Sequence, residues 1–252
     1  MALYIIGIGL SDGKDITLKG LEAVKKCDWV YLENYTSILQ VPVSKLEEIY
    51  DKKIILADRD MVEKKADEIL DNAKQKDAAF LVVGDPMSAT THVDLMLRAK
   101  EKNIDVKVIH NASVLTAIGI TGLQLYKFGK VTSLPFPENV KAETPYNVLK
   151  LNKQNKMHTL ILLDIEPDKN KFMTVNEAIK IMLSIEEKRK ETVFTVDTFI
   201  VGCARLGSDD FIVNPGKVSD LLDFDFGKPP HCLIIPSEMH FMEEDALKEF
   251  NQ

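Results

Sequence analysis

Cysteine is scarce in this sequence, with three among 252 residues. Cys27, Cys203 and Cys232 stand far apart and lack the C-x-x-C spacing of a zinc or redox site. Three isolated cysteines are too few for a disulfide framework or a cysteine-only zinc site. So low a number of cysteines is typical of a protein in a reducing cytosol. The five histidines are equally scattered, without an H-x-x-x-H pair, so the sequence predicts no metal site.

Long apolar runs and an excess of basic charge are also missing. No segment approaches the roughly 18 apolar residues that a membrane-spanning helix needs. The start, MALYIIGIGL, has no basic region before its apolar residues, so we expect no signal peptide and a cytoplasmic location. The net charge of −7 argues against a broad nucleic-acid footprint, and a hydrophobic fraction of 45% is that of an ordinary globular protein.

Two stretches combine an apolar strand with a glycine turn: LYIIGIGL at residues 3–10 and LVVGDP at residues 81–86. Such turns at the ends of parallel strands usually mark a small-molecule site. The first half-spells the dinucleotide fingerprint G-x-G-x-x-G, but Asp12 stands where the third glycine belongs. The helix also begins only near Thr17, which weighs against NAD, although Glu33 lies where a ribose-binding acid could sit.

The first half of the chain alternates short apolar runs with amphipathic helices. Strands are predicted at 3–8, 29–34, 78–83 and 105–109, and helices from about Thr17 and over about 62–75 and 91–101. The helix from Thr17 should carry Leu18, Leu21 and Val24 on one face. This alternation predicts a parallel sheet that is covered on both faces.

The second half of the chain has a different order of predicted strands and helices. Strands are predicted at 159–165, 198–204, 210–213 and 231–236 around one long helix over about 174–189, after a turn-rich stretch at 128–148. Successive strands without an intervening helix imply antiparallel pairing and hence a mixed sheet. We therefore expect two α/β domains, residues 1–112 with a parallel sheet and residues 113–252 with a mixed sheet.

Six segments of the chain are the most specific: GDPMSATTH (84–92), HNASVLTAIG (110–119), LLDIEP (162–167), MTVNEAI (173–179), CARLGS (203–208) and PPHCLIIP (229–236). In these segments and in their order, the chain resembles the tetrapyrrole methylase superfamily and, within it, the diphthine synthase family. The resemblance runs through nearly all 252 residues. It implies two α/β domains with a cofactor cleft between them, and usually a homodimer.

This resemblance implies a methyltransferase that uses S-adenosyl-L-methionine and releases S-adenosyl-L-homocysteine. Enzymes of the family methylate the amine of a 3-amino-3-carboxypropyl-histidine in translation elongation factor 2, a step of diphthamide biosynthesis. The segment at 162–179 leads quickly into the next helix, as in the shorter members that stop at three transfers and add no methyl ester. The protein substrate would then be elongation factor 2, with no membrane or direct nucleic-acid partner.

The family's cofactor contacts fall on eight positions, each of which also has an ordinary structural role open to it. Asp85 follows Gly84 in a rigid turn, where a carboxylate can equally bond its own backbone. A serine at such a position can cap a helix, a leucine can be plain core, and a histidine that opens a buried strand is usually a hydrogen-bonded core residue. The positions are Leu10, Asp85, Ser88, Ser113, Val114, Leu163, Leu206 and His231.

Two other functions remain open at the level of sequence. A methyltransferase for a small, precorrin-type tetrapyrrole would share the fold and the cofactor, although LLDIEP and MTVNEAI weigh against it. A regulatory protein from another class would hold a nucleotide without performing chemistry.

No catalytic side chain stands out. The sequence has no G-x-S-x-G elbow, and its cysteines lack the context of a nucleophile. Transfer from an activated sulfonium mainly requires alignment and exclusion of water. We therefore leave the catalytic residues unassigned and expect the acceptor amine to lose its proton to water.

Overall fold

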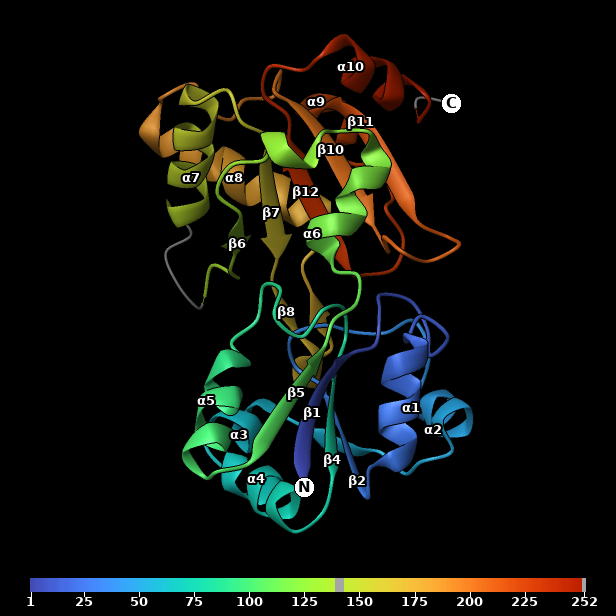
Figure 1. Cartoon of the computed structure of the whole chain (residues 1–252). Helices are drawn as coiled ribbons and strands as arrows, with labels where there is room; N and C mark the ends of the chain where they lie inside the picture. Colours follow the sequence, from blue (N-terminus) through green and yellow to red (C-terminus); the bar gives the residue numbers. More distant parts are fainter. Residues whose placement is uncertain (139–142, 251–252) are drawn as a thin grey trace. The chain divides into compact units, whose positions relative to one another are not determined.

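The computed structural model describes residues 1–138 and 143–250 (Figure 1). The chain divides into two compact units, one of Met1–Ala117 and one from Ile118 onward. The domain division after residue 112 that the sequence suggested stays a prediction. Within the described ranges, no helix has the length and apolar character that crossing a membrane would require.

The first unit is built on an all-parallel sheet of five strands in the order β3-β2-β4-β1-β5. This confirms the predicted parallel sheet. The pattern had missed the short strand β3. The strands are β1 (Ala2–Gly7), β2 (Trp29–Glu33), β3 (Ile55–Ala57), β4 (Ala78–Val82) and β5 (Asp105–Ile109).

Helices cover both faces of this sheet because its strands are apolar on both sides. Alternate strand residues contribute to two separate cores, one with α1 and α2 and one with α3, α4 and α5 (Figure 1). On β4, Phe80 belongs to one core and Leu81 to the other. The helices of the unit are α1 (Leu18–Lys26), α2 (Val43–Tyr50), α3 (Arg59–Glu63), α4 (Ala66–Gln75), α5 (Val93–Glu101) and α6 (Val114–Ala117).

Two helix predictions for this unit need correction. α1 begins after Thr17 as expected, since the Thr17 hydroxyl accepts a hydrogen bond from the Gly20 amide at 3.0 Å. Val24 is buried and Leu21 packs against the core, as expected, but Leu18 is 82% exposed. Gly20 and Ala23 complete the buried face in its place. In place of the single helix predicted over 62–75, the structure has two helices, α3 and α4. The first begins earlier than predicted because the Asp58 carboxylate caps its N-terminus and accepts from the Met61 amide.

The second unit contains the predicted mixed sheet, in the order β11-β10-β12-β7-β6. The β6–β7 pair is parallel and the other pairs are antiparallel. Its strands are β6 (Thr132–Leu134), β7 (Thr159–Leu163), β10 (Phe199–Ala204), β11 (Ile212–Lys217) and β12 (His231–Ile235). The strand predicted at 159–165 ends at Leu163, and a separate hairpin of β8 (Ile165–Glu166) and β9 (Lys171–Phe172) follows it.

The long helix predicted at 174–189 is α8 (Val175–Arg189). A capping box starts it: the Thr174 hydroxyl accepts from the Glu177 amide at 3.2 Å, and the Glu177 carboxylate accepts from the Thr174 amide at 2.8 Å. Within the turn-rich stretch at 128–148, residues 139–142 lie outside the described residues. The remaining helices are α7 (Glu143–Gln154), α9 (Val218–Leu221) and α10 (Phe241–Lys248), with short 3-10 turns η1 (Ile118–Thr121), η2 (Leu125–Lys127) and η3 (Pro167–Lys169).

A fully buried carboxylate attaches the last helix, α10, to the rest of the second unit. Glu243 accepts hydrogen bonds from the amides of His240 at 2.7 Å and Gln124 at 2.9 Å. It also accepts from His158 Nε2 at 3.0 Å and from Lys127 Nζ. Burial alone would raise the pKa of Glu243, but these donors hold that pKa at about 2. The carboxylate is therefore charged at neutral pH.

We expect Glu243→Gln to lower the free energy of unfolding by about 3 kcal/mol, since it removes the counter-charge of Lys127. Breaking a buried ion pair costs about 3–5 kcal/mol of stability. Because the Lys127 side chain is 24% exposed, we expect a value at the lower end of this range. Glu244→Gln, at an exposed position of the same helix, should change the stability by less than about 0.5 kcal/mol. Urea unfolding at pH 7 measures both variants.

The difference between wild type and Glu243→Gln should shrink with acid. The pKa of Glu243 falls from an ordinary 4.5 to about 2 on folding, so its contribution is present above pH 4.5 and is lost as the pH falls toward 2. Equal losses in the Glu243 and Glu244 variants, or a difference that does not depend on pH, would contradict this account.

Candidate functional site

The two glycine turns meet at the carboxyl ends of the neighbouring strands β1 and β4. The Gly84 amide donates to the Gly9 carbonyl at 2.7 Å, and the Gly9 amide donates back to Gly84 at 3.4 Å. Both residues have positive φ, +82° at Gly9 and +81° at Gly84, which favours glycine. From β1 the chain leads toward β2, and from β4 it leads to β5 on the opposite side. Ligands of α/β sheets bind at such a switch point.

The glycines of these turns are needed for different reasons. A Cβ atom at Gly7 would lie 2.5 Å from the carbonyl oxygen of Gly84 and 2.8 Å from Cβ of Asn111, so packing excludes a side chain there. The nearest atoms to a Cβ atom at Gly84 would be the Ala112 carbonyl oxygen and Cδ2 of Leu10, both 3.7 Å away. These are ordinary van der Waals distances, so Gly84 owes its identity to its backbone conformation and not to crowding.

The buried carboxylate of Asp85 ties the loop after β4 to the loop after β5. Oδ1 accepts from the Met87 amide at 2.9 Å and from the Ser88 hydroxyl at 3.0 Å. Oδ2 accepts from the Asn111 amide at 3.1 Å and lies 2.7 Å from His110 Nδ1. Burial by itself raises the pKa of Asp85, but the four donors outweigh it and lower that pKa below its usual range. Asp85 is therefore ionised, and protein donors occupy both of its oxygens.

The other predicted contacts of the first unit lie around the same loops. The Ser88 hydroxyl donates to Asp85 and does not cap α5, whose N-cap is His92. Ser113 is 6% exposed, and its hydroxyl forms no hydrogen bond with any residue that the structure describes. The structure brings together, at one end of the first unit's sheet, Leu10, Asp85, Ser88, Ser113 and Val114.

The remaining three predicted contacts lie in the second unit, where β12 pairs with both β7 and β10. Leu163 ends β7, Leu206 follows β10, and both are buried, as plain core residues would be. His231 opens β12, where Nδ1 accepts from the Val175 amide at 3.3 Å and Nε2 lies 3.1 Å from the Lys228 carbonyl. Burial lowers the pKa of His231, so it is a neutral, hydrogen-bonded core histidine. Cofactor contacts at these positions stay predictions.

The loop after β1 is not built for a dinucleotide. The Asp15 carboxylate accepts hydrogen bonds from the amides of Ser11 at 2.7 Å and of Leu10 at 3.2 Å. A bound pyrophosphate would need these same amides as donors. Glu33, the residue in the ribose-binding position, is 1% exposed and accepts from the Thr36 amide at 2.6 Å and from the Thr36 hydroxyl at 2.8 Å. Both acidic groups are engaged by the protein itself.

Inspection of the sequence alone missed the roles of His110 and Asn111. The Asn111 side chain donates to the carbonyls of Gly7 and Asp15, both at 3.0 Å, and so connects the loop after β5 with the loop after β1. His110 is the first residue after β5, and its side chain is 68% exposed. A polar pair directly after a strand of a parallel sheet was the signal that could have identified them.

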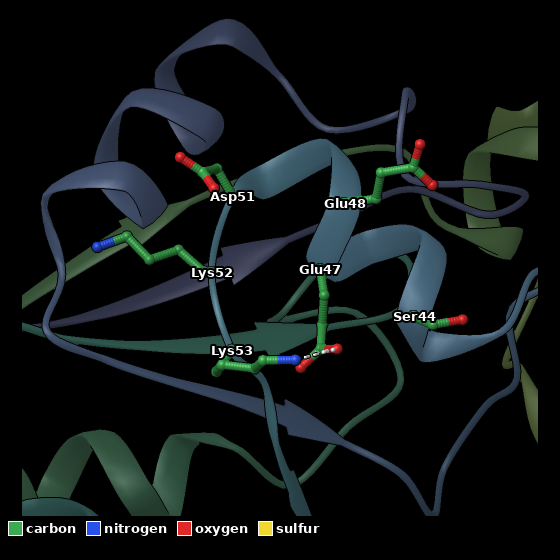
Figure 2. A pocket seen from close by; sticks show the side chains of 6 residues that line it. All are labelled: Ser44, Glu47, Glu48, Asp51, Lys52 and Lys53. Atoms are coloured by element: carbon green, nitrogen blue, oxygen red, sulfur yellow. Dashed lines mark hydrogen bonds and ion pairs between the residues drawn. The ribbon is translucent and has the colours of Figure 1, made fainter.

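A hollow of the first unit, about 410 Å³, lies open beside α2, away from the glycine turns (Figure 2). Its charged groups are engaged locally: Lys53 pairs with Glu47 at 3.3 Å, and Lys52 donates to the Cys27 carbonyl at 2.7 Å. None of the predicted cofactor contacts lines it. The lining residues are Ser44, Glu47, Glu48, Asp51, Lys52 and Lys53.

Comparison with known proteins agrees with the fold and with the family that the sequence resembles. Residues 2–222 match the family model of the tetrapyrrole (corrin/porphyrin) methylases. A diphthine methyl ester synthase of Dictyostelium discoideum is 48% identical over 268 residues, which cover 99% of this chain and 98% of that protein. A diphthine synthase of Methanococcus maripaludis is 51% identical over 248 residues, with coverage of 98% and 97%.

A solved structure of diphthine synthase is similar with a TM-score of 0.91 at 37% identity, and covers 99% of this chain and 96% of its own. The family model spans most of the chain, and the relatives span nearly all of it. The parallel and mixed sheets described above are the architecture that the resemblance implied. This chain therefore belongs to the tetrapyrrole methylase family.

Proposed function

We propose that this protein is a methyltransferase that uses S-adenosyl-L-methionine to methylate the amine of the 3-amino-3-carboxypropyl-histidine of translation elongation factor 2. The observation that carries the proposal is the identity of 48% and 51% to a diphthine methyl ester synthase and a diphthine synthase over nearly the whole chain. The reaction would take place in the cytoplasm, as a step of diphthamide biosynthesis, and release S-adenosyl-L-homocysteine.

The residues around the glycine turns fit a polar, nucleoside-bearing cofactor. Ser113 offers a hydroxyl that has no partner among the described residues, although the residue is nearly buried. The apolar side chain of Leu10 lies next to Gly84 in the same turns. Asp85 and Ser88 bond to each other, so their part would be to hold the loop backbone in place for the cofactor. Leu163, Leu206 and His231 complete the proposed set.

When bound, the cofactor would supply a methyl group activated by its sulfonium: a nitrogen–carbon bond to the amine would form while the carbon–sulfur bond breaks with its electron pair on sulfur. The protein must then bind and orient both partners and exclude water. Leu10 and Val114 are partly exposed apolar residues beside Gly84 and Ser113 and serve the exclusion of water.

We propose three transfers, which yield a trimethylammonium, rather than four with a methyl ester. The segment at 162–179 supports this because it returns directly from β7 through the β8–β9 hairpin into α8. The names of the two relatives differ on this point, at nearly equal identities of 48% and 51%. Identity alone therefore does not separate the two outcomes.

Labelled S-adenosyl-L-methionine tests the function directly. We expect label on elongation factor 2 that carries the modified histidine, and the intact mass of that factor should count three added methyl groups. Label on a precorrin-type tetrapyrrole would support the tetrapyrrole methyltransferase. Binding without transfer to either acceptor would support a regulatory protein. Either result would overturn the proposal.

A serine variant tests the cofactor site. Ser113→Ala should weaken S-adenosyl-L-methionine binding about two- to tenfold, the value of one hydrogen bond. Ser184→Ala is the matched control, since its exposed hydroxyl donates only to the Ile181 carbonyl of its own helix, and it should bind normally. Calorimetric titration gives both dissociation constants. An unchanged constant for a folded Ser113→Ala protein would remove Ser113 from the site.

We also propose a homodimer whose contact surface lies on the second unit. The sequence offers two apolar segments for it, 172–185 and 239–250. The first is unsuitable, because α8 buries its apolar residues in the core of its own unit. The second exposes Phe241 by 62% and Met242 by 58% at the start of α10.

Two further exposed side chains lie on elements that pack against α10. They are Ile120, 53% exposed on η1, and Tyr126, 79% exposed on η2. The Gln124 amide, between these turns, donates to Glu243 of α10. Single exposed apolar side chains are normal on a protein surface, but four on elements that contact one another indicate an interaction surface. A second copy of the chain would cover these four side chains.

Light scattering at micromolar concentration should give twice the monomer mass of 28.4 kDa. Phe241→Glu should convert the dimer to a monomer, because it places a charge in the proposed contact surface. The variant should still fold, because an acidic residue is favourable at the first position of a helix. Leu18→Glu, at a position 82% exposed in the first unit, should remain dimeric. A wild-type mass of one chain would refute the dimer.

A further inference from the structure

His110 occupies a fixed position at the carboxyl end of the first unit's sheet. It directly follows β5, the neighbour of β1, and precedes Asn111. Asn111 bonds to Asp85 through its amide and to the carbonyls of Gly7 and Asp15 through its side chain. The backbone that carries His110 is therefore anchored to the loops that follow β1 and β4.

The imidazole of His110 is held by one nitrogen and free at the other. Nδ1 lies 2.7 Å from Oδ2 of Asp85. Asp85 is ionised and can only accept, so Nδ1 carries the proton in the neutral ring. Nε2 then presents a lone pair, and it has no hydrogen bond or ion pair among the described residues. With its side chain 68% exposed, His110 offers this lone pair to an incoming group.

None of the other four histidines combines these properties. His92, His158 and His231 are buried. His240 is exposed, but its Nδ1 accepts a hydrogen bond from the Met242 amide, so its Nε2 carries the proton in the neutral ring. His110 is thus the histidine whose exposed nitrogen is ready to accept a proton.

We infer that His110, oriented by Asp85, is the general base that takes the proton from the acceptor amine. This inference rests on the proposed function. The nitrogen–hydrogen bond of the substrate ammonium breaks, its electron pair stays on the amine, and the proton binds Nε2 of His110. The carboxylate of Asp85 stabilises the imidazolium, as the orienting carboxylate does in catalytic triads. Water then takes the proton from His110, and the ring is restored for the next transfer.

The advantage of such a base has a defined size. An α-amine has a pKa of about 7.7–8.0, so roughly a tenth of it is free base at pH 7. A base does not change this fraction at equilibrium, but it gives a bound ammonium a route for losing its proton where water is excluded. Without the base, only the roughly one tenth of the substrate that binds as free amine at pH 7 would react, and the base would bring nothing once the pH exceeds the pKa of the amine.

Few charged groups of the first unit face His110. Asp85 is in direct contact. Asp15, which is linked through Asn111, has its carboxylate engaged by the amides of its own loop. Lys107 on β5 lies over the ring of Tyr4 and pairs with Asp105 at 3.7 Å. Asp85 is therefore the charged group of the first unit that the structure shows in contact with His110.

The test is the single-turnover rate of the first methylation of elongation factor 2 at saturating S-adenosyl-L-methionine, between pH 6.5 and 9.5. His110→Gln should be slower by about tenfold at pH 7 and should approach wild type above about pH 8.5. His240→Asn, which keeps a helix-capping side chain at an exposed histidine, should match wild type throughout.

Two measurements that do not depend on turnover accompany the rates. Calorimetry should give His110→Gln an unchanged dissociation constant for S-adenosyl-L-methionine. Nitrogen NMR of the wild-type imidazoles should show His110 protonated at Nδ1 in its neutral form. A loss that is equal at every pH and accompanied by weaker cofactor binding would indicate a structural role and overturn the inference.

The outcomes separate the two proposals. If wild type methylates elongation factor 2 and His110→Gln keeps the full rate at pH 7, the general base is wrong and the proposed function stands. If wild type transfers no methyl group to elongation factor 2, the proposed function fails, and the role of His110 toward that amine fails with it.

Discussion

The four hydrogen bonds of the Asp85 carboxylate determine how the first unit presents its candidate site. Two come from its own loop and two from the loop after β5, so one buried charge sets the spacing of both. The Gly9–Gly84 bridge and the Asn111 side chain then add the loop after β1. The same carboxylate that organises the backbone also orients His110. Structure and chemistry depend here on a single ionised group.

Two other carboxylates perform comparable structural tasks, one buried and one partly buried. The buried Glu243 attaches α10 through Lys127 and His158, and the partly buried Glu186 accepts from the amides of Val193 and Phe194 after α8. Burial raises the pKa in each case, and the converging donors bring it down to about 2. Full hydrogen bonding is the condition under which such charges can be taken out of water. What distinguishes Asp85 is that the side chain of one of its donors, His110, is 68% exposed.

The positions that the family resemblance selected differ in physical character. The Ser113 hydroxyl has no hydrogen-bond partner among the described residues, and the apolar side chain of Leu10 lies next to Gly84. Asp85 and His231 have their polar atoms engaged by the protein. Such residues can support a site by fixing the shape of its backbone, which carries the remaining donors and acceptors. A role in binding therefore need not mean a direct contact by the side chain.

The sequence by itself determined most strands of the two sheets and the starts of α1 and α8, because period-two and period-3.6 patterns and caps such as Thr17 and Thr174 are local. It did not reveal β3, β6, the helices α2, α7 and α10, the split into α3 and α4, or the exposure of Leu18, which depend on what packs against each element. The resemblance marked Asp85, but only the tertiary structure paired it with His110, 25 residues away. Parallel strands bring distant loops to one sheet edge, and no local pattern records which side chains meet there.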